Sequence, residues 1–501
     1  METDDILSSV EETTSSTVRS NTSNLLVNDT YDFNFNDVDT TSEKLQLLAH
    51  HEGPRDRFSS TYFIFFAFGI GSFLPWTVFI MAGEYFDLKL WSANSTSDNL
   101  ENTYESYVSA AAQSSNVTFL LVNVYITHRF TAKIRIYSAL LSMLLLLLST
   151  VVFVYIDTSQ WRYQFFGITM VTIVAVNAAG AFFLGGIVGI AGMMPPKYTQ
   201  AVLAGQGVAG MITSFCQVFS LLGSGGTRAV LSDSQKQRSA LGYFLSSSVF
   251  IAFCLFLFRL LHNLPFAVHH FENSKNSNIN TSVGDGQERK QPTQPKKWEV
   301  FKQIRKPALA VLLTSLATVF VYPAVGSLVR STAWSQHRCQ VHRNDSLFRN
   351  TTYNTSSGTA WTCTYFTPVG CFLLYNVGNA VGRLFPRCIH KPKNQWLFLA
   401  VCCIRLLFLP TWLMMRYEGM ESPLLNSDIY PLTLMPILSL SNGYFVTLAM
   451  MYGPKSISGD ACMETAGSIM AAFYGGGILL GSLVSLIIVQ IIIPIVKSHG
   501  W

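Results

Sequence analysis

Long apolar stretches alternate with short polar segments along most of this chain. A helix that crosses a bilayer needs about 20 mostly apolar residues, and eleven stretches reach that length. They cover Ser60–Phe86, Glu105–Thr127, Arg135–Ile156, Tyr163–Met193, Tyr198–Leu222, Ala240–Leu261, Pro307–Val329, Tyr365–Pro386, Trp396–Met415, Tyr430–Tyr452 and Ala466–Val496. The pattern therefore predicts an all-α membrane protein with eleven transmembrane helices.

The composition agrees with this prediction. Of the 501 residues, 49% are apolar and only 13% are charged, whereas soluble domains average about 25% charged residues. The mean hydropathy is +0.31. These values exclude an ordinary soluble domain, and we expect the lipid bilayer and a small solute as partners, with no nucleic acid.

Residues 1–54 have a different composition from the rest. They are rich in Ser, Thr, Asn and Asp and poor in large apolar residues, so they cannot bury enough surface to fold. We expect a disordered cytoplasmic tail here. The first apolar run begins near position 60 and is too long for a signal peptide, so we expect it to remain as a helix.

The basic loops predict the orientation of the helices. The sequences "HRFTAKIR" and "PRCIHKPK" follow the second and the eighth span, and lysines and arginines recur between residues 263 and 306. Positive charge favours the cytoplasmic side. We therefore expect a cytoplasmic N-terminus, a six-helix bundle at 55–262, a cytoplasmic linker loop at 263–306, and a five-helix bundle at 307–501 whose C-terminus is extracellular or luminal.

Sequons for N-glycosylation fit this orientation. Four of them lie on loops that it places outside, at Asn94, Asn344, Asn350 and Asn354. A single sequon is weak evidence, but their clustering on outer loops is stronger. Sequons at Asn21, Asn28 and Asn280 fall on the cytoplasmic side and should stay unmodified.

Two of the nine cysteines are candidates for a disulfide. Cys339 and Cys363 share the predicted outer loop, where a disulfide is possible in an oxidising compartment. Most of the other cysteines fall in apolar spans, where a small buried thiol is the usual interpretation.

The loops also suggest two related halves. The two short basic loops each follow the second span of a half, and the long polar loop separates six spans from five. Two halves related by an axis along the membrane normal, with a solute site between them, are typical of rocking carriers. The simpler alternative is that the basic loops only set the topology.

Polar residues inside the spans are the candidate site residues. Such groups usually face the bundle interior or a water-filled cavity. The set comprises Asn123, Asn177, Gln206, Asn376, Asn379, Arg383, Arg405 and Asn442. No HExxH, GxSxG, Walker loop or metal-ligand spacing is present, so the chain offers no catalytic, cofactor or metal candidates, and we do not expect an enzyme.

Several motifs resemble the equilibrative nucleoside transporter family (solute carrier family 29). Span one reads "GIGSFLPWTVFIMAGEYF", and the turn between spans four and five reads "GIVGIAGMMPPKYTQAVLAGQGVAG". Further matches are "YNVGNAVGRLFP", "IRLLFLP", "SNGYFVTLAMMYGPK" and "ETAGSIMAAF", in the family's order. The resemblance implies a fold like the major facilitator superfamily, alternating access and facilitated diffusion of nucleosides.

The resemblance also implies a set of substrate-binding positions. They are Phe73, Trp76, Thr77, Ile80, Leu184, Asn379 and Arg383. Gln206, Asn376, Arg405 and Asn442 are structural or gating candidates. Three of the substrate-binding positions depart from the family pattern: Thr77 replaces an asparagine, Leu184 a glutamine, and Asn379 an aspartate one turn before Arg383.

These departures differ in their expected effect. Leu184 cannot hydrogen-bond a base, and an unpaired buried polar group costs about 1 to 3 kcal/mol. Asn379 keeps hydrogen-bonding capacity but carries no charge. Arg383 is then not neutralised by its neighbour, and we expect a water-filled cavity to solvate it, which disfavours cationic solutes. The alternative for Arg383 is to snorkel to the cytoplasmic face, and for Arg405 to link helices.

The tail contains a possible sorting signal. "EKLQLL" has Glu43 before the paired Leu47 and Leu48, as in signals read by clathrin adaptors. The plasma membrane is favoured, with late endosome or lysosome as the alternative. The basic segment from Lys296 to Lys306 could attract anionic lipid head groups of the bilayer.

Together these features favour a facilitative nucleoside carrier with an atypical pocket. The alternatives are a relative that carries nucleobases or another small polar solute, and a non-transporting membrane receptor or scaffold. A scaffold needs no polar set inside its spans, so the buried polar residues disfavour it.

Overall fold

The structure is a computed structural model. It describes residues 56–90, 100–127, 129–158, 160–223, 233–270, 297–333, 361–392, 394–417, 424–457 and 460–492. The chain divides into two compact units, Met1–Arg55 and Asp56–Trp501. All described residues belong to the second unit. The predicted sorting signal, the four outer sequons, and the proposed pairing of Cys339 with Cys363 lie outside the residues whose side chains are described.

The second unit is built of helices. Its first part contains η2 (Arg57–Ser59), α3 (Ser60–Met81), α4 (Gly83–Leu90), α5 (Leu100–Ile126), α6 (Ala132–Tyr155), α7 (Arg162–Gly192), α8 (Pro196–Gly223) and α9 (Asp233–Leu261). Every predicted span of this part falls on helical segments, although the first is divided between α3 and α4. The described residues contain isolated β-bridges but no strand.

The helices after the long polar loop are more interrupted. They are α11 (Lys297–Val319), α12 (Ala324–Leu328), η3 (Trp361–Tyr365), η4 (Pro368–Leu373), α14 (Leu374–Leu384), η5 (Phe385–Arg387), α15 (Gln395–Ile404), η6 (Arg405–Leu407), α16 (Phe408–Leu413), α17 (Ile429–Lys455), α18 (Asp460–Ile487) and η7 (Ile488–Ile492). The turns η3, η4 and η7 are π-helical.

Nine helices in the described part of the chain are long and apolar enough to cross a membrane. The nine do not include the predicted spans Glu105–Thr127 and Tyr365–Pro386. The first lies on α5, whose sequence carries Glu, Asn, Gln, Ser and Thr along much of its length. The second is divided between π-helical turns and the short α14. Helix length and apolar composition therefore support a multi-pass membrane protein, but they do not reproduce the predicted count of eleven spans.

Two predicted spans differ from the helices in their bounds. The span predicted from Pro307 begins ten residues earlier as α11, with Glu299 in the first turn and Pro307 buried inside the helix. The predicted cytoplasmic linker thus ends in helix. The span predicted as Ser60–Phe86 is broken between α3 and α4, where Ala82 leaves the helical region with ψ of 10°.

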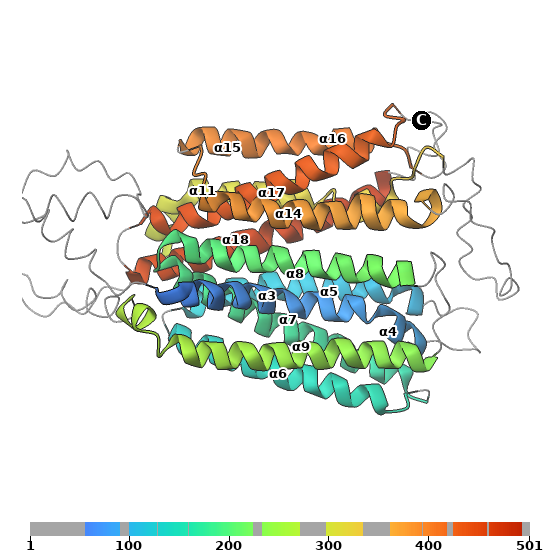
Figure 1. The fold of residues 1–501 in the computed structure, drawn as a ribbon, viewed down its shortest axis with the longest axis horizontal. Helices are drawn as coiled ribbons and strands as arrows, with labels where there is room; N and C mark the ends of the chain where they lie inside the picture. Colours follow the sequence, from blue (N-terminus) through green and yellow to red (C-terminus); the bar gives the residue numbers. More distant parts are fainter. Residues whose placement is uncertain are drawn as a thin grey trace, which may run out of the picture. The chain divides into compact units, whose positions relative to one another are not determined.

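The second unit is one compact body, and we describe it as two groups in chain order, α3–α9 and α11–α18, which contact each other along two seams (Figure 1). In the first group α3 packs on α8, while α5 and α6 pack on α7. In the second group α11 packs on α17 and α18, and α14 packs on α17. The groups meet where α8 contacts α14, and where α5 and α7 contact α18.

The core of the first group is aromatic. Phe68 on α3 lies edge-on to Phe183 of α7, with ring centroids 5.8 Å apart, and 6.1 Å from the ring of Phe258. Phe65 makes a similar contact with Tyr198 of α8. Large aromatic side chains bury much apolar surface and fix relative helix positions, so this group is held together mainly by apolar packing.

Glycine brings α3 and α8 unusually close. A Cβ atom added to Gly69 would lie 2.0 Å from the carbonyl oxygen of Val202, and one added to Gly205 would lie 2.0 Å from that of Phe66. Only glycine leaves room for two backbones at this distance. This contact sets Ser72 of α3 and Gln206 of α8 beside each other.

Candidate solute-binding site

Arg383 lies at the seam between the two groups of helices. Its side chain extends from α14 and is buried, with 4% of its surface exposed. Its Nη1 atom donates hydrogen bonds to the carbonyl oxygen of Leu203 at 2.7 Å and to Oε1 of Gln206 at 3.0 Å, both on α8. Its Nη2 atom donates to the hydroxyl of Tyr474 on α18 at 3.3 Å.

These contacts differ from both expectations for Arg383. The guanidinium is buried between helices and does not snorkel to the cytoplasmic face. Its acceptors are a carbonyl, an amide and a hydroxyl of the protein, where we expected the water of a cavity. The physical reason is that a buried charge must be hydrogen-bonded, and α8 brings acceptors within reach.

Two glutamines of α8 continue the contact with α14. Gln206 donates through Nε2 to the hydroxyl of Ser72 at 3.0 Å, which ties α3 to the same network. Gln200, fully buried, donates to the backbone carbonyl of Arg383 at 3.0 Å and accepts from the hydroxyl of Tyr62 at 3.0 Å. Arg383 is thus held by both its side chain and its backbone.

Asn379 lies one turn before Arg383 and joins a second chain of hydrogen bonds. Its Oδ1 atom accepts from Nδ2 of Asn442 on α17 at 3.0 Å. Oδ1 of Asn442 accepts from the hydroxyl of Thr318 on α11 at 2.9 Å, and that hydroxyl accepts from Nη2 of Arg405 at 2.7 Å. The amide of Asn379 is therefore already engaged within the second group of helices.

Arg405 links helices of the second group. It is 3% exposed and donates to the carbonyl oxygen of Leu438 and to the hydroxyls of Ser441 and Thr318. These acceptors lie on α11 and α17. Arg405 therefore connects α11 to α17, which is the helix-linking role given above as its alternative.

Asn376 lies one turn further toward the N-terminus of α14. Its Nδ2 atom donates to the hydroxyls of Ser214 on α8 at 2.7 Å and of Tyr322 at 3.0 Å. The ring of Tyr322 stacks on Tyr375 with centroids 3.6 Å apart. Asn376 is therefore a second polar contact between α8 and α14.

Glycines of α8 and α17 allow these helices to approach α14. A Cβ on Gly207 would lie 2.9 Å from Cα of Ala380 and 3.0 Å from Cδ of Arg383. A Cβ on Gly443 of α17 would lie 2.3 Å from the carbonyl oxygen of Asn379. Polar side chains on α14 therefore meet their partners because small residues surround them.

The span-one positions are less closely connected to this network. Phe73 is half-buried, and its ring would lie 3.9 Å from a Cβ added to Gly210 of α8, which also adjoins Asn376. The buried hydroxyl of Thr77 hydrogen-bonds back to the carbonyls of Phe73 and Leu74. Ile80 is half-buried in the core, and the side chain of Trp76 lies outside the described residues.

Leu184 is a buried core residue of α7 with 7% of its surface exposed. Six other predicted site residues do bond to neighbouring helices. They are Gln206, Asn376, Asn379, Arg383, Arg405 and Asn442. Among the hydrogen bonds of the described residues, none connects Thr77 or Leu184 to this network.

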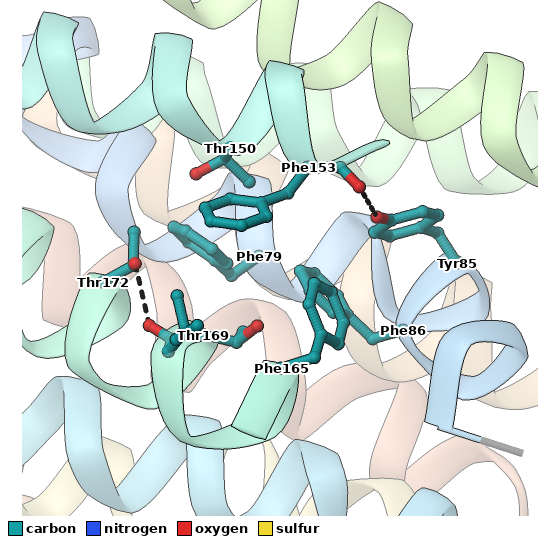
Figure 2. Close-up of a pocket in the computed structure, with 9 residues that line it drawn as sticks. Phe79, Tyr85, Phe86, Thr150, Phe153, Phe165, Thr169 and Thr172 are labelled. Carbon is teal, nitrogen blue, oxygen red and sulfur yellow. Dashed lines mark hydrogen bonds between the residues drawn. The ribbon is translucent and has the colours of Figure 1, made fainter. Parts of the chain in front are cut away.

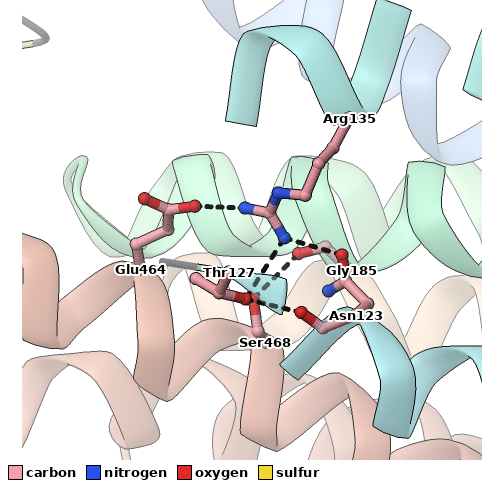
Figure 3. A network of polar contacts seen from close by, with 6 residues as sticks. All are labelled: Asn123, Thr127, Arg135, Gly185, Glu464 and Ser468. Atoms are coloured by element: carbon pink, nitrogen blue, oxygen red, sulfur yellow. Dashed lines mark hydrogen bonds and ion pairs between the residues drawn. The ribbon is translucent and has the colours of Figure 1, made fainter. Parts of the chain in front are cut away.

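The sequence reasoning missed an ion pair at the other seam. Arg135 of α6 pairs with Glu464 of α18 and also donates to Oδ1 of Asn123 at 2.6 Å and to the hydroxyl of Thr127 at 3.2 Å (Figure 3). Ser468 of α18 donates to the carbonyl of Gly185 on α7 at 3.3 Å. Charged and polar contacts therefore hold α18 against the first group of helices.

A signal for this pair is present in the sequence. Arg135 and Glu464 stand close to the starts of the third and eleventh predicted spans, both on the expected cytoplasmic side. The sequence pattern assigns Arg135 to a basic loop that sets topology, whereas the structure buries its side chain to 2% exposure. Two opposite charges near the starts of different spans on the same side of the membrane form a pattern that could have indicated the pairing.

A cavity in the first group of helices does not have the features of a solute site. It is lined by Phe79, Tyr85, Phe86, Thr150, Phe153, Phe165, Ile168, Thr169 and Thr172 (Figure 2). The hydroxyls of Tyr85, Thr150 and Thr172 donate to backbone carbonyls, so they are not free to donate to a sugar. Of the predicted substrate-binding residues, none lines this cavity.

Comparisons with known proteins agree on one family. A family model described as nucleoside transporter matches residues 170–490. Equilibrative nucleoside transporter 3 of Rattus norvegicus is 27% identical over 453 residues, covering 86% of this chain and 88% of that protein. Equilibrative nucleoside transporter 1 of Rattus norvegicus is 28% identical over 483 residues, covering 87% and 98%.

A solved structure shows the same fold at low sequence identity. The major facilitator superfamily proton:xylose symporter XylE, bound to 6-bromo-6-deoxy-D-glucose, matches with a TM-score of 0.55 and 11% identity, covering 88% of this chain and 90% of that chain. The fold is therefore all-helical and like that of the major facilitator superfamily.

Proposed function

The chain belongs to the nucleoside transporter family, and we propose on this premise that it carries nucleosides across a membrane, down their gradient, by alternating access. The family and the fold are those of transporters and not of enzymes. The relatives are named equilibrative nucleoside transporters, which supports transport without coupling to an energy source.

The main structural support for this proposal is the contact of Arg383 with α8. Arg383 of the second group of helices binds α8 of the first group through Leu203 and Gln206. Polar contacts across a seam can be exchanged for contacts with water or a solute, since the net stabilisation from each hydrogen bond of a charged group is only about 1.5 to 3 kcal/mol. Such a seam can open and close more readily than an aromatic core.

The second seam supports the same mechanism. Arg135 and Glu464 join α6 to α18, and Ser468 joins α18 to α7. A carrier that alternates between two accessible states must break one set of contacts between its halves while it forms another. We assign the ion pair to the set that closes one side of the carrier, and Arg383 to the solute site between the halves.

The finer features are part of the proposal. We infer eleven spans in a six-plus-five arrangement, a cytoplasmic N-terminus, and substrate contacts from Phe73, Trp76, Thr77, Ile80, Leu184, Asn379 and Arg383. Burial of Phe73 and Arg383 beside α8 supports the first and the last of these positions. We propose the plasma membrane as the location, with routing to endosomes through the Glu43–Leu48 signal as the alternative.

Uptake measurements test the proposal. Purified protein in proteoliposomes should take up radiolabelled uridine or adenosine with saturation, and unlabelled nucleoside on the opposite side should accelerate the flux. Arg383→Ala should lower the uptake, while Arg238→Ala, which removes an exposed guanidinium at the start of α9, should not. Adenine uptake without nucleoside uptake would favour the nucleobase alternative, and no flux from correctly folded protein would favour a scaffold.

A further inference from the structure

Two guanidinium groups are buried in the second group of helices with no carboxylate partner among the residues that the structure describes. Arg383 and Arg405 are 4% and 3% exposed. Their hydrogen bonds go to carbonyl, amide and hydroxyl oxygens, whereas Arg135 at the other seam is paired with Glu464. The charges of Arg383 and Arg405 therefore remain unneutralised by the described side chains.

Acidic residues are few in the second group: α11 carries Glu299 in its first turn, and α18 carries Asp460 and Glu464, the latter paired with Arg135. Between residues 307 and 455 the acids are Asp345, Glu418, Glu421 and Asp428. The first three lie outside the described residues. Asp428 lies at the N-cap of α17, where its carboxylate accepts hydrogen bonds from the Ser331 hydroxyl and the Thr332 amide, both at 2.7 Å. It therefore does not compensate Arg383 or Arg405.

Neutral acceptors solvate both arginines but do not cancel their charges. A carbonyl, an amide and a hydroxyl surround the Nη atoms of Arg383. The Nε atoms of Arg383 and Arg405 are both buried without a hydrogen-bond partner. An uncompensated buried charge has a large desolvation penalty, and an anion close to it would relieve that penalty.

Arg383 is the better placed of the two to meet a solute. The hydrogen-bond acceptors of Arg405 belong to α11 and α17, so it lies within one group of helices. Arg383 bridges both groups, and its network includes Ser72 and Tyr474, which each keep part of their surface exposed. Among the described hydrogen bonds, Oδ1 of Asn379 accepts from Asn442 and not from Arg383.

We propose that the solute site at Arg383 takes up a negatively charged group together with, or as part of, a nucleoside. The charge could belong to the solute itself, as in a nucleoside monophosphate, or to a small inorganic anion bound beside a neutral nucleoside. Either would offer charge-assisted hydrogen bonds to the guanidinium. The inference rests on the proposed function, since it concerns the same site.

Two uptake measurements in proteoliposomes distinguish the sources of the charge. The first compares labelled uridine monophosphate with labelled uridine. The second measures uridine uptake after chloride and phosphate are replaced by gluconate. We expect either saturable uptake of uridine monophosphate or a loss of uridine uptake of at least about fivefold, the lower end of coupling between two bound ligands.

An added carboxylate provides the decisive variant. Asn379→Asp keeps an oxygen that can accept from Asn442 and places a negative charge one turn from Arg383. It should lower uptake of uridine monophosphate, or the dependence of uridine uptake on the anion, by about tenfold or more, as expected when a charged hydrogen bond is lost. Arg383→Gln, which removes the positive charge, should have the same effect.

The matched control changes an amide to a carboxylate outside the spans. Asn426→Asp keeps the acceptor for Arg416 and should behave as wild type. Uridine uptake that is independent of the anion, with no entry or competition by uridine monophosphate, would overturn the inference while leaving nucleoside transport intact. Uptake of uridine monophosphate without uptake of uridine would support the inference and contradict transport of a neutral nucleoside. No flux of either solute would overturn both the inference and the proposed function.

Discussion

The guanidinium of Arg135 on α6 is paired with the carboxylate of Glu464 on α18, 329 positions further along the chain. The pair joins the two groups of helices at the seam where α5 and α7 meet α18. Asn123 and Thr127 accept hydrogen bonds from Nη1 of Arg135, so the guanidinium contacts three side chains.

Removing one partner of this pair should destabilise the folded state strongly. Glu464→Gln leaves Arg135 buried with no carboxylate, which typically costs about 3 to 5 kcal/mol. The apparent melting temperature in detergent should therefore fall. Arg135→Gln with Glu464→Gln should lose less stability than the sum of the two single variants, and additive losses would show that the two residues do not interact.

The glycine contact between α3 and α8 should tolerate no side chain. In Gly205→Ala the added Cβ would meet the carbonyl oxygen of Phe66 at 2.0 Å. Overpacking of this kind costs about 1 to 3 kcal/mol or more, so the melting temperature should fall. Gly242→Ala on α9 is the control, because a Cβ there meets nothing within 4 Å, and an equal effect of both variants would contradict the packing argument.

Thr318 should matter for the network that positions Asn379. Thr318→Val removes the hydroxyl that accepts from Arg405 and donates to Asn442, so two buried groups lose a partner at a cost of about 1 to 3 kcal/mol each. Stability should fall, and uptake of nucleoside with it. Thr433→Val on α17 removes a hydroxyl that bonds to carbonyls of its own helix and should have little effect.

Stability should depend on pH through His262, which follows α9. Burial lowers the pKa of His262 below its ordinary value of 6.5; a hydrogen bond with the backbone carbonyl of Phe258 partly opposes this shift, and nearby Lys133 adds to it. The unfolded chain therefore binds a proton at higher pH than the folded one. The contribution of His262 to the free energy of unfolding is fully present above about pH 6.5, and it is lost as the pH falls toward the pKa of the folded state.

Replacing His262 should remove this dependence. His262→Gln should reduce the loss of melting temperature between pH 7.5 and pH 5.5 relative to wild type, both values being chosen to lie about one unit on either side of the ordinary pKa. An identical pH profile for wild type and variant would show that other groups govern the loss.

Glycosylation should report the orientation of the chain. Digestion with a glycosidase should lower the apparent mass of protein from eukaryotic cells, and Asn→Gln changes at the four outer sequons should remove that shift. The four positions are Asn94, Asn344, Asn350 and Asn354. Changes at Asn21, Asn28 and Asn280 are the controls and should leave the mass unchanged, whereas glycan at these three sites would reverse the predicted orientation.

Helix positions followed from the sequence to a large degree. The span predicted as Tyr163–Met193 is α7 at Arg162–Gly192, and that predicted as Tyr430–Tyr452 lies within α17. The physical reason is local, because a segment in lipid must satisfy its backbone hydrogen bonds internally and must be mostly apolar. Breaks such as that at Ala82 were not predicted, since they depend on packing between helices.

The polar residues of α14 were identifiable from the sequence as a candidate site, but their partners were not. Asn379 and Arg383 stand out as polar positions in an apolar run, and their motif resembles a known family. That Asn442 engages Asn379, and that Gln206, Leu203 and Tyr474 surround Arg383, depends on which helices lie side by side. No local pattern encodes that choice.

The sequence by itself determined that this protein is a helical membrane transporter of one family, because apolar length and motif order are properties of the linear chain. Only the tertiary structure decided which charges are compensated. It pairs Arg135 with Glu464 and leaves Arg383 with neutral acceptors, because hydrogen bonds and ion pairs act over a few ångströms in space between residues that are hundreds of positions apart in the chain.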